Sequence, residues 1–458
     1  MVTVSKTPSR STLNEWDYAH AWHPFTQASE RDQAKHLQIE RGEGNWLVDA
    51  QGKRYLDGTA SLWTNVRGHD DPDLKEALRR QLDRLPHSTY LGLAHSPATR
   101  LARKLAEIAP GELEVSFFSD NGSCAVEVAL KMSLQFWQLS GRSEKSKIAA
   151  MQGAYHGDTF GAMSVSGEGP FTERFRPWCF EVNRFSAPRC LESCGIVHEA
   201  DATHSLAALE DLLDREGSRL AAVVLEPSVQ GAAGMKQQPP GFVAKVASLC
   251  KEAEVHLILD EVFVAFGRLG TMLVCAQEGV QPDFLCLAKG LTGGYLPLAA
   301  TMTTKEICAV FEGPYDEHRT LYHGHTFTAN PLAASVALRN VELLEKDMAD
   351  GLVANISDNF GKQVERYFGK HSCVGQVRQR GLACCLDLCP PNRSFESYPK
   401  ERRVGLEVCL EARQRGVLLR PLGNSIPLIP PILIRPEEIE ILCIALRDAL
   451  DATLQKGT

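Results

Sequence analysis

The chain has 458 residues, of which 44% are hydrophobic and 23% are charged, as in an ordinary globular protein with one large and one smaller domain. Its formal net charge of -8 argues against a general nucleic-acid binder. No apolar stretch approaches the roughly 20 residues that span a bilayer, and the start of the chain lacks the apolar core of a signal peptide. We therefore expect a cytoplasmic protein without membrane or nucleic-acid partners, whose 14 cysteines stay reduced.

In chain order, the first part of the sequence predicts an extended arm with short strands. Residues 43–49 and 51–57 are typical of a hairpin that turns near Gly52. From about residue 75 onward, apolar strands alternate with helical stretches, which predicts a mainly parallel α/β sheet. A long helix from about 331 to 345 then leads to a smaller α+β unit with strands at 381–387 and 416–420. The expected domains are an N-terminal arm at 1–75 that contributes to the small domain, a large domain at 76–345 and a small C-terminal domain at 346–458.

Two segments of the expected large domain suit a phosphate and a flat ring. Residues 115–118 predict a strand, and the apolar spacing from residue 125 onward predicts a helix, so Gly122 and Ser123 should lie at a helix N-terminus that attracts anions. Plain capping of that helix by Asn121 or Ser123 is the alternative interpretation. Tyr155 follows a strand around Ile148 and is placed either to stack on a ring or to act as an ordinary half-buried aromatic.

Two further strands end in residues of opposite charge. Lys289 closes the apolar run 284–288, and Asp260 closes the run 255–259. Because the carboxyl ends of parallel strands meet at one sheet edge, both side chains should face the same crevice. A lysine that forms a Schiff base and an acid that pairs with a ring nitrogen are the two protein groups that pyridoxal phosphate requires. Either residue alone has a simpler explanation, the lysine as a snorkelling side chain and the acid as a helix cap.

One cysteine group invites comparison with a metal site. Cys190, Cys194 and His198 fall within nine residues. No second ligand pair follows at the spacing of a zinc finger, and the segment has the character of an irregular loop. We therefore predict no metal site.

Together these segments resemble the class III, or ω-type, aminotransferases. The resemblance extends from about residue 22 to about 431 and is carried by SDNGS at 119–123, YHGD at 155–158, EP at 226–227, DEV at 260–262, AKG at 288–290 and HGHTF at 323–327. Within that class the chain looks most like the 7,8-diaminopelargonic acid synthases, through WHPFT at 22–26, SLW at 61–63, YHGDTFGAMS at 155–164 and LRPLG at 419–423.

The resemblance implies the fold, the cofactor and the reaction. The fold would be that of fold type I pyridoxal-phosphate transferases, an α/β architecture whose large domain has a mainly parallel sheet, plus a smaller α+β domain. The enzyme would be a homodimer that uses pyridoxal 5'-phosphate. It would convert 8-amino-7-oxononanoate to 7,8-diaminononanoate in biotin biosynthesis, with S-adenosylmethionine or lysine as amino donor.

The resemblance also assigns residues. Lys289 would be catalytic, forming a Schiff base with the cofactor and then moving a proton between cofactor and substrate. The cofactor would be bound by Gly122, Ser123, Tyr155, Asp260, Val262, Lys289, His325 and Thr326. Thr326 would come from the partner subunit. The substrates would be bound by Phe25, Leu62, Trp63, Tyr155, Gly324 and Arg420.

Arg420 would bind the substrate carboxylate, a task that suits the geometry of a guanidinium group. It follows an apolar run, where an unpaired charge is improbable. A pairing with an internal acid is therefore the alternative role for this side chain.

The chain departs from the family pattern at five positions. Val264, Ala265 and Leu269 replace a threonine, a glycine and a second threonine after the DEV segment, so the local packing below the cofactor ring should differ. Phe25 stands where many relatives have a tyrosine, and Leu62 where many have a tryptophan. Both changes make the donor pocket more apolar and leave the amino donor open between S-adenosylmethionine and lysine.

Two other functions compete with this interpretation. Another ω-aminotransferase, acting on ornithine, γ-aminobutyrate or β-alanine, or a related aminomutase, would share the fold and the cofactor. A non-enzymatic binding protein on the same fold would not need Lys289, Asp260 and the phosphate loop together.

Overall fold

The computed structural model describes residues 9–28, 36–190, 195–197, 200–391 and 396–455. At its centre is a seven-stranded sheet in the order β4-β15-β14-β13-β10-β5-β6. In chain order these strands are β4 Val115–Ser119, β5 Lys147–Met151, β6 Asn183–Phe185, β10 Leu220–Leu225, β13 His256–Asp260, β14 Phe284–Leu287 and β15 Ala299–Thr303. Strand β15 runs in the direction opposite to that of the other six strands, which confirms the predicted mainly parallel sheet.

Successive strand residues bury against two different sets of helices. One hydrophobic cluster joins Ile148 and Ala150 of β5 and Ile258 of β13 to helices α5 (Gly122–Leu139) and α6 (Phe160–Val165). The residues that alternate with them, such as Met151 and Leu259, join a second cluster. That cluster includes side chains of α4 (Ser96–Ile108), α7 (Thr203–Glu216), α8 (Phe242–Glu252) and α11 (Pro331–Ala349). Because both sheet faces are covered, the strands read as continuous apolar runs.

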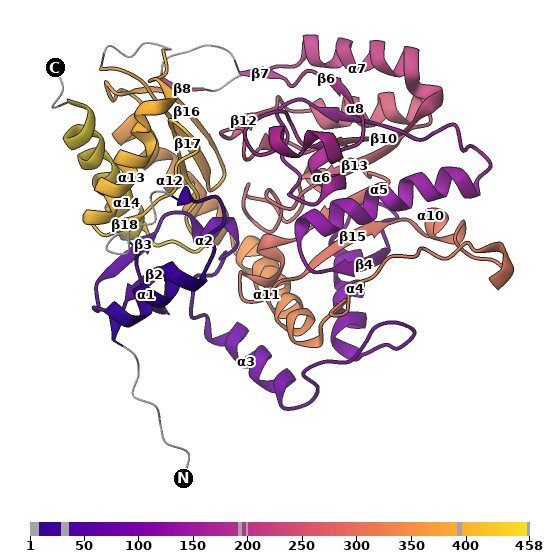
Figure 1. Ribbon diagram of the computed structural model, residues 1–458, viewed down its shortest axis with the longest axis horizontal. Coiled ribbons are helices and arrows are strands. Elements are labelled where there is room, and N and C mark those ends of the chain that lie inside the picture. Colours follow the sequence, from indigo (N-terminus) through magenta and orange to yellow (C-terminus); the bar gives the residue numbers. More distant parts are fainter. Residues whose placement is uncertain (1–8, 29–35, 191–194, 198–199, 392–395, 456–458) are drawn as a thin grey trace.

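A second sheet joins the two ends of the chain. Strands β1 (Ile39–Glu43), β2 (Trp46–Asp49) and β3 (Arg54–Asp57) are antiparallel, as predicted for the hairpin, and β18 (Val417–Leu418) adds parallel to β3. In Figure 1 the indigo arm accordingly lies beside the yellow C-terminal elements. The predicted strand at 416–420 ends at Leu418, so Arg420 lies beyond it.

The rest of the C-terminal part is built on a four-stranded sheet. Its order is β19-β17-β16-β8, from Ser425–Leu428, Ala383–Leu388, Val374–Arg380 and Gly195–Ile196. Helices α12 (Leu352–Phe368), α13 (Val404–Gln414) and α14 (Pro436–Leu450) belong to this part. Helix α11 crosses the predicted boundary between residues 345 and 346, and the domain limits stay a prediction.

The remaining α-helices and strands have 11 residues or fewer. They are α1 Arg10–His20, α2 Ala60–Trp63, α3 Pro72–Leu82, α9 Val274–Gln277, α10 Lys305–Ala309, β7 Arg189–Cys190, β9 Ala200–Asp201, β11 Val229–Gln230 and β12 Lys236–Gln237. Among the described residues, no helix is long and apolar enough to cross a membrane.

A buried glutamate connects the N-terminal arm to helix α14. Glu438 is 2% exposed, and its carboxylate accepts hydrogen bonds from Asn45 Nδ2 at 2.7 Å and Trp46 Nε1 at 2.7 Å. Arg435 adds bonds from its backbone N–H at 3.0 Å and its guanidinium at 2.7 Å. Burial by itself would raise the pKa of Glu438, but these donors lower it below its ordinary value.

We expect Glu438→Gln to lower the free energy of unfolding by about 2 kcal/mol at neutral pH, because a buried charge-assisted contact is lost and one donor faces an amide. A carboxyl group whose folded-state pKa is lowered stabilises the fold above its unfolded pKa of about 4.5. The difference between variant and wild type should therefore shrink as the pH falls through the folded-state pKa. Denaturant unfolding at several pH values measures it.

The matched control is Glu437→Gln, the adjacent and exposed position on the same helix. It should change stability by less than about 0.5 kcal/mol. Equal effects at the two positions would contradict the role given to Glu438.

Candidate active site

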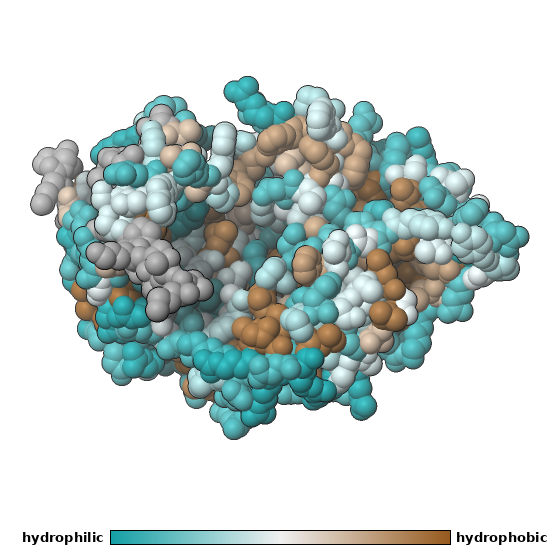
Figure 2. All heavy atoms as spheres, turned by 60° about the horizontal axis from the view of Figure 1, so that its bottom comes forward, coloured by the Kyte–Doolittle hydropathy of each residue, from teal (hydrophilic) through white to brown (hydrophobic). Residues whose placement is uncertain are grey.

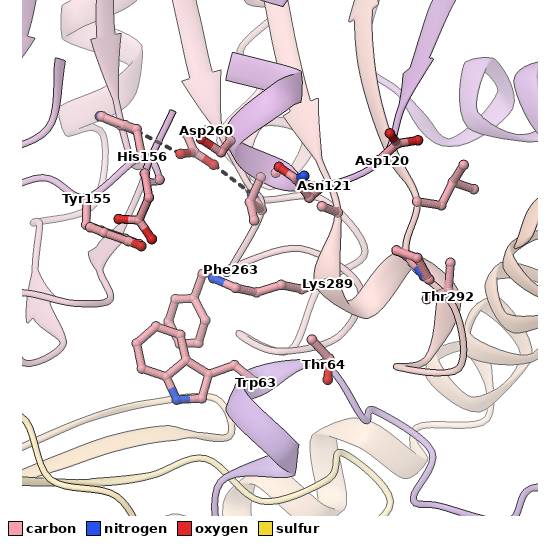
Figure 3. Close-up of a pocket in the computed structure, with 18 of the residues that line it drawn as sticks. Trp63, Thr64, Asp120, Asn121, Tyr155, His156, Asp260, Phe263, Lys289 and Thr292 are labelled. Carbon is pink, nitrogen blue, oxygen red and sulfur yellow. Dashed lines mark hydrogen bonds and ion pairs between the residues drawn. The ribbon is translucent and has the colours of Figure 1, made fainter. Parts of the chain in front are cut away.

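A cavity of about 700 Å³ opens at the carboxyl edge of the central sheet. Its wall includes residues at or shortly after the ends of four parallel strands: Gly122 after β4, Tyr155 after β5, Glu226 after β10 and Asp260 at the end of β13. Lys289 follows β14 and enters the same cavity. In Figure 3, Lys289 extends between Asp260 and His156 on one side and Phe263 and Trp63 on the other. The predicted meeting of Asp260 and Lys289 at one sheet edge is confirmed.

The Lys289 side chain lies among aromatic rings and acids. Its Nζ is 5.0 Å from the centre of the Trp63 ring and 5.6 Å from that of Phe263. Burial lowers the pKa of Lys289, while the negative charges of Asp260 and Glu226 act in the opposite direction. The backbone of Lys289 has a φ of 44°, in the left-handed region that a lysine rarely adopts. The amine is thus held by strained backbone in a setting that favours its neutral, nucleophilic form.

Asp260 is fixed by a histidine. It is 5% exposed, its Oδ2 lies 2.7 Å from His156 Nδ1, and its Oδ1 accepts a bond of 3.0 Å from the N–H of Val262. The other ring nitrogen of His156, Nε2, is buried and has no partner among the described residues. No role was predicted for His156, although it lies in the YHGD segment. Its contact with Asp260 joins residues 104 positions apart, which no local pattern reveals.

Glu226 is a second buried acid without a predicted role. Its carboxylate accepts hydrogen bonds from the N–H groups of Tyr155 at 3.0 Å and Gly231 at 2.9 Å, and so ties two loops of the cavity wall together. Burial raises the pKa of Glu226 to about 7. The sequence pattern that predicted Asp260, an acid at the end of an apolar strand, would also have predicted Glu226.

The N-terminus of α5 forms a cradle in the wall. Asn121 caps the helix through a 3.0 Å bond from Cys124 N–H, as in the capping alternative, and Gly122 and Ser123 occupy the first turn. N–H groups of a first turn have no partner within their own helix. A Cβ added at Gly122 would lie 2.6 Å from Val262 Cγ1, so only glycine fits there. Ser123 Oγ lies 2.7 Å from Thr159 Oγ1 and accepts a 3.0 Å bond from the N–H of Thr159.

The residues predicted to bind substrate divide into two groups. Trp63 and Tyr155 line the cavity, whereas Phe25, Leu62, Gly324 and Arg420 do not. Phe25 and Arg420 nevertheless meet, because Arg420 Nη2 donates to the Phe25 carbonyl at 3.3 Å. Among the described residues no acid forms an ion pair with the exposed Arg420, so the alternative pairing has no support there.

A chain of aromatic rings links Phe25 to the cavity. The Phe25 ring packs edge-on against Phe171 with centres 5.5 Å apart, and Phe171 packs against Tyr155 with centres 6.2 Å apart. Phe171 belongs to no predicted motif. Leu62 is exposed on the turn that ends in Trp63.

Of the cofactor residues assigned by resemblance, His325 and Thr326 lie outside the cavity wall. His325 Nδ1 lies 2.9 Å from the carboxylate of Asp120, which does line the cavity. Thr326 and Gly324 are exposed on the surface of the single chain. The three residues that depart from the family pattern, Val264, Ala265 and Leu269, are buried in hydrophobic clusters, Val264 and Leu269 beside Phe263.

Two other groups bear on metal binding. Cys194 and His198 of the cysteine group lie outside the described residues. In the arm, His23 Nε2 and His36 Nδ1 contact the Asp17 carboxylate at 2.9 Å and 3.1 Å. The absence of a metal site stays a prediction.

Comparison with known proteins agrees with this geometry. The chain belongs to the class-III aminotransferase family, whose sequence profile matches residues 27–450. Its fold is that of the fold type I pyridoxal-phosphate transaminases, and the protein is accordingly an enzyme of that class.

Its relatives include proteins of one particular activity. The adenosylmethionine-8-amino-7-oxononanoate aminotransferase of Geobacter sulfurreducens is 45% identical over 442 residues, covering 96% of this chain and 97% of the relative. The crystal structure of the enzyme of that name from Methanocaldococcus jannaschii superimposes with a TM-score of 0.92 at 39% identity, over 97% of this chain and 100% of the other. An (S)-enantioselective omega-transaminase from Thermomicrobium roseum reaches a TM-score of 0.90 at 33% identity, over 98% and 100%.

Proposed function

We propose that the cavity binds pyridoxal 5'-phosphate, covalently attached through Lys289. Three features of this chain fit the group. The first turn of α5 offers N–H donors and a positive helix end for the phosphate, through Gly122 and Ser123. Asp260 offers a carboxylate for the ring nitrogen, and Lys289 offers an amine whose pKa is lowered by burial.

Bound pyridoxal phosphate supplies an aldehyde that condenses with amines and a ring that accepts electrons from a substrate carbon. Lys289 would hold the cofactor covalently and would take and return the proton at the reacting carbon of the substrate. His156 holds the Asp260 carboxylate, which would pair with the ring nitrogen. Tyr155 and Val262 line the cavity and would border the ring, and burial raises the pKa of Tyr155, so its phenol stays protonated.

We propose that the acceptor is 8-amino-7-oxononanoate and that the product is 7,8-diaminononanoate, a step of biotin biosynthesis. The observation that carries the proposal is the near full-length identity to relatives of that activity, 45% in the Geobacter protein. The contact of Arg420 with the Phe25 carbonyl supports it. It places an exposed guanidinium, without an acid partner among the described residues, at the outer end of the Phe25–Phe171–Tyr155 series of rings. A carboxylate bound there would leave its apolar chain along those rings, with the ketone near Lys289.

The amino donor is S-adenosylmethionine or lysine. The relatives carry adenosylmethionine in their names, which favours the first. Phe25 lacks the hydroxyl and Leu62 lacks the indole that many relatives have at these positions, and this favours an apolar donor pocket.

A second function, that of another omega-transaminase, is supported by the similarity to the Thermomicrobium enzyme. Both functions use the same Lys289 and Asp260.

We propose that the enzyme is a homodimer in which Thr326 of each chain contacts the phosphate held by the other. Thr326 is exposed in the single chain, and so are the apolar side chains of Phe327, Leu91 and Leu93, at 57%, 69% and 57%. The segment before Leu91 and the segment that carries Thr326 are in contact, since the ring centres of His87 and Phe327 lie 4.7 Å apart. Hydrophobic side chains also gather near the centre of the face shown in Figure 2. Exposed apolar side chains that gather on one face are typical of a subunit interface.

We expect Lys289→Ala to lose covalent cofactor attachment and transamination, with kcat lowered by more than about 1,000-fold, because one amine serves both as attachment point and as proton carrier. The visible absorption of the protein and the mass of the borohydride-reduced chain measure attachment. The control is Lys305→Ala, an exposed lysine paired with Glu114. Near-normal turnover by Lys289→Ala would refute the assignment.

The substrate proposal is tested by steady-state kinetics with 8-amino-7-oxononanoate and each donor in turn. Arg420→Ala should raise KM for the oxononanoate about 10- to 100-fold, the loss typical of a charge-assisted contact, while the bound cofactor remains. Arg415→Ala, an exposed arginine at the end of α13, is the control. No turnover with either donor, together with turnover of simple ω-amino acids, would favour the second function.

Phe25→Tyr should shift preference toward S-adenosylmethionine if the apolar pocket selects lysine.

The dimer proposal predicts that sedimentation velocity finds a species of twice the chain mass. Phe327→Asp should shift it toward monomer and lower phosphate-dependent cofactor affinity, because a charge would be buried at the interface. Tyr315→Asp, at an aromatic residue that is 89% exposed, is the control. A fully active monomer would overturn the role given to Thr326.

A further inference from the structure

The segment that carries Trp63 into the cavity has an unusual backbone. Ala60, Ser61, Leu62 and Trp63 have φ values of 43°, 46°, 72° and 73°. The turn is closed by bonds from Trp63 N–H to the Thr59 carbonyl at 2.8 Å and from Thr64 N–H to the Ala60 carbonyl at 2.9 Å. Four consecutive L-residues in the left-handed region cost free energy, because each Cβ crowds the following carbonyl oxygen. Such a turn persists only when its surroundings hold it.

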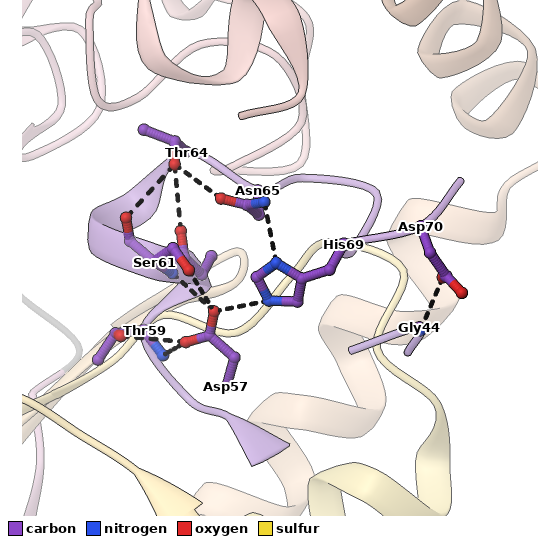
Figure 4. A network of polar contacts seen from close by, with 9 residues as sticks. Gly44, Asp57, Thr59, Ser61, Thr64, Asn65, His69 and Asp70 are labelled. Atoms are coloured by element: carbon purple, nitrogen blue, oxygen red, sulfur yellow. Dashed lines mark hydrogen bonds and ion pairs between the residues drawn. The ribbon is translucent and has the colours of Figure 1, made fainter. Parts of the chain in front are cut away.

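The group that holds the turn is the carboxylate of Asp57, the last residue of β3. Asp57 is 1% exposed. Its Oδ1 accepts bonds from Thr59 N–H and Thr59 Oγ1, both at 3.1 Å. Its Oδ2 accepts bonds from Ser61 N–H at 2.7 Å and Ser61 Oγ at 2.9 Å. Figure 4 shows this carboxylate at the base of the turn.

His69 completes the network on the far side of Asp57. Its Nε2 lies 3.0 Å from Asp57 Oδ2, and with that nitrogen as donor, its Nδ1 accepts a 3.2 Å bond from Asn65 Nδ2. The side-chain amide oxygen of Asn65, Oδ1, in turn accepts a 2.9 Å bond from Thr64 Oγ1. Thr64 lines the cavity, so the network runs from a buried acid to the cavity wall.

The turn sets the place of the Trp63 ring. The ring centre lies 4.6 Å from that of Phe263 and 5.0 Å from Lys289 Nζ. A Cβ added at Gly231 would lie 2.9 Å from Phe263 Cδ1 and 3.2 Å from Trp63 Cζ3, so the loop after β11 packs closely against both rings. A right-handed or extended path from Thr59 to Thr64 would direct the indole elsewhere.

We propose that Asp57 and His69 are positioning residues that hold Ala60–Trp63 in its left-handed turn and thereby fix Trp63 and Thr64 in the cavity wall, which sets the affinity for substrate. The role in substrate affinity rests on the proposed function. The role in holding the turn rests on this chain's geometry alone, and the two are measured separately.

The main variant is Asp57→Asn, which keeps the shape of the side chain but removes the charge and one acceptor. KM for 8-amino-7-oxononanoate should rise about tenfold with a smaller change in kcat, because substrate contact is loosened while Lys289 and Asp260 stay in place. Hydrogen exchange of the peptide covering residues 58–66 should speed up. His69→Gln leaves Asp57 in place and should change both readouts in the same direction, and it serves if Asp57→Asn does not fold.

The matched control is Asp49→Asn. Asp49 is a buried acid of the same sheet whose carboxylate accepts bonds from the N–H groups of Gln51 and Lys53 and from the hydroxyl of Tyr55. This variant should lower thermal stability and leave KM and the exchange of residues 58–66 as in the wild type. Equal changes in Asp49→Asn and Asp57→Asn would overturn the proposal, since general destabilisation would then explain both.

A second substitution tests the conformation itself. Ser61→Gly in the Asp57→Asn background should return KM to within about threefold of wild type, because glycine adopts a positive φ without strain. Failure of this rescue, or unchanged exchange in Asp57→Asn, overturns the proposal. Absence of turnover with the oxononanoate in the wild type would instead reject the proposed function, and the exchange measurements would still decide whether Asp57 and His69 hold the turn.

Discussion

Burial disfavours the ammonium form of Lys289, and the nearby carboxylates of Asp260 and Glu226 offset only part of that desolvation. These acids are themselves buried, and each depends on further partners. Asp260 depends on His156 and the N–H of Val262, and Glu226 on the N–H groups of two loops. Each charged group of the cavity therefore depends on the others and on their hydrogen-bond partners. The fold has to place all of these groups close to one another.

The central sheet meets that requirement through its register. Backbone hydrogen bonds place Asp260 opposite Cys286, three residues before Lys289, so the separation of acid and amine is fixed by strand pairing rather than by flexible loops. The same edge receives the helix start at Gly122 and the loops at Tyr155 and Glu226. Reactive groups carried on strand ends are held more closely than groups on long loops, and this suits a site in which an amine has to act first as a nucleophile and then as a proton carrier.

The opposite wall of the cavity has a different origin. Trp63 and Thr64 belong to the N-terminal arm, which is held by the pairing of β3 with β18 and by the bonds of Glu438 to Asn45 and Trp46. The arm also carries Phe25, whose carbonyl accepts a bond from Arg420. Several residues around the cavity, among them Trp63, Lys289 and Phe25, have positive φ values. Strain of this kind gathers where surrounding contacts are dense enough to hold it.

Local sequence patterns determined the buried strands, the hairpin at 43–57, the helix that starts at Gly122 and the shared sheet edge of Asp260 and Lys289, because each follows from residue periodicity or from the last residue of a strand. The family resemblance added the class of enzyme. The tertiary structure alone decided that His156 orients Asp260, that Phe171 bridges Phe25 and Tyr155, that Arg420 lies beyond its strand, and that Ala60–Trp63 forms a left-handed turn. These features depend on contacts between segments distant in the sequence or on strain held by such contacts, and neither leaves a local periodicity that a sequence can display.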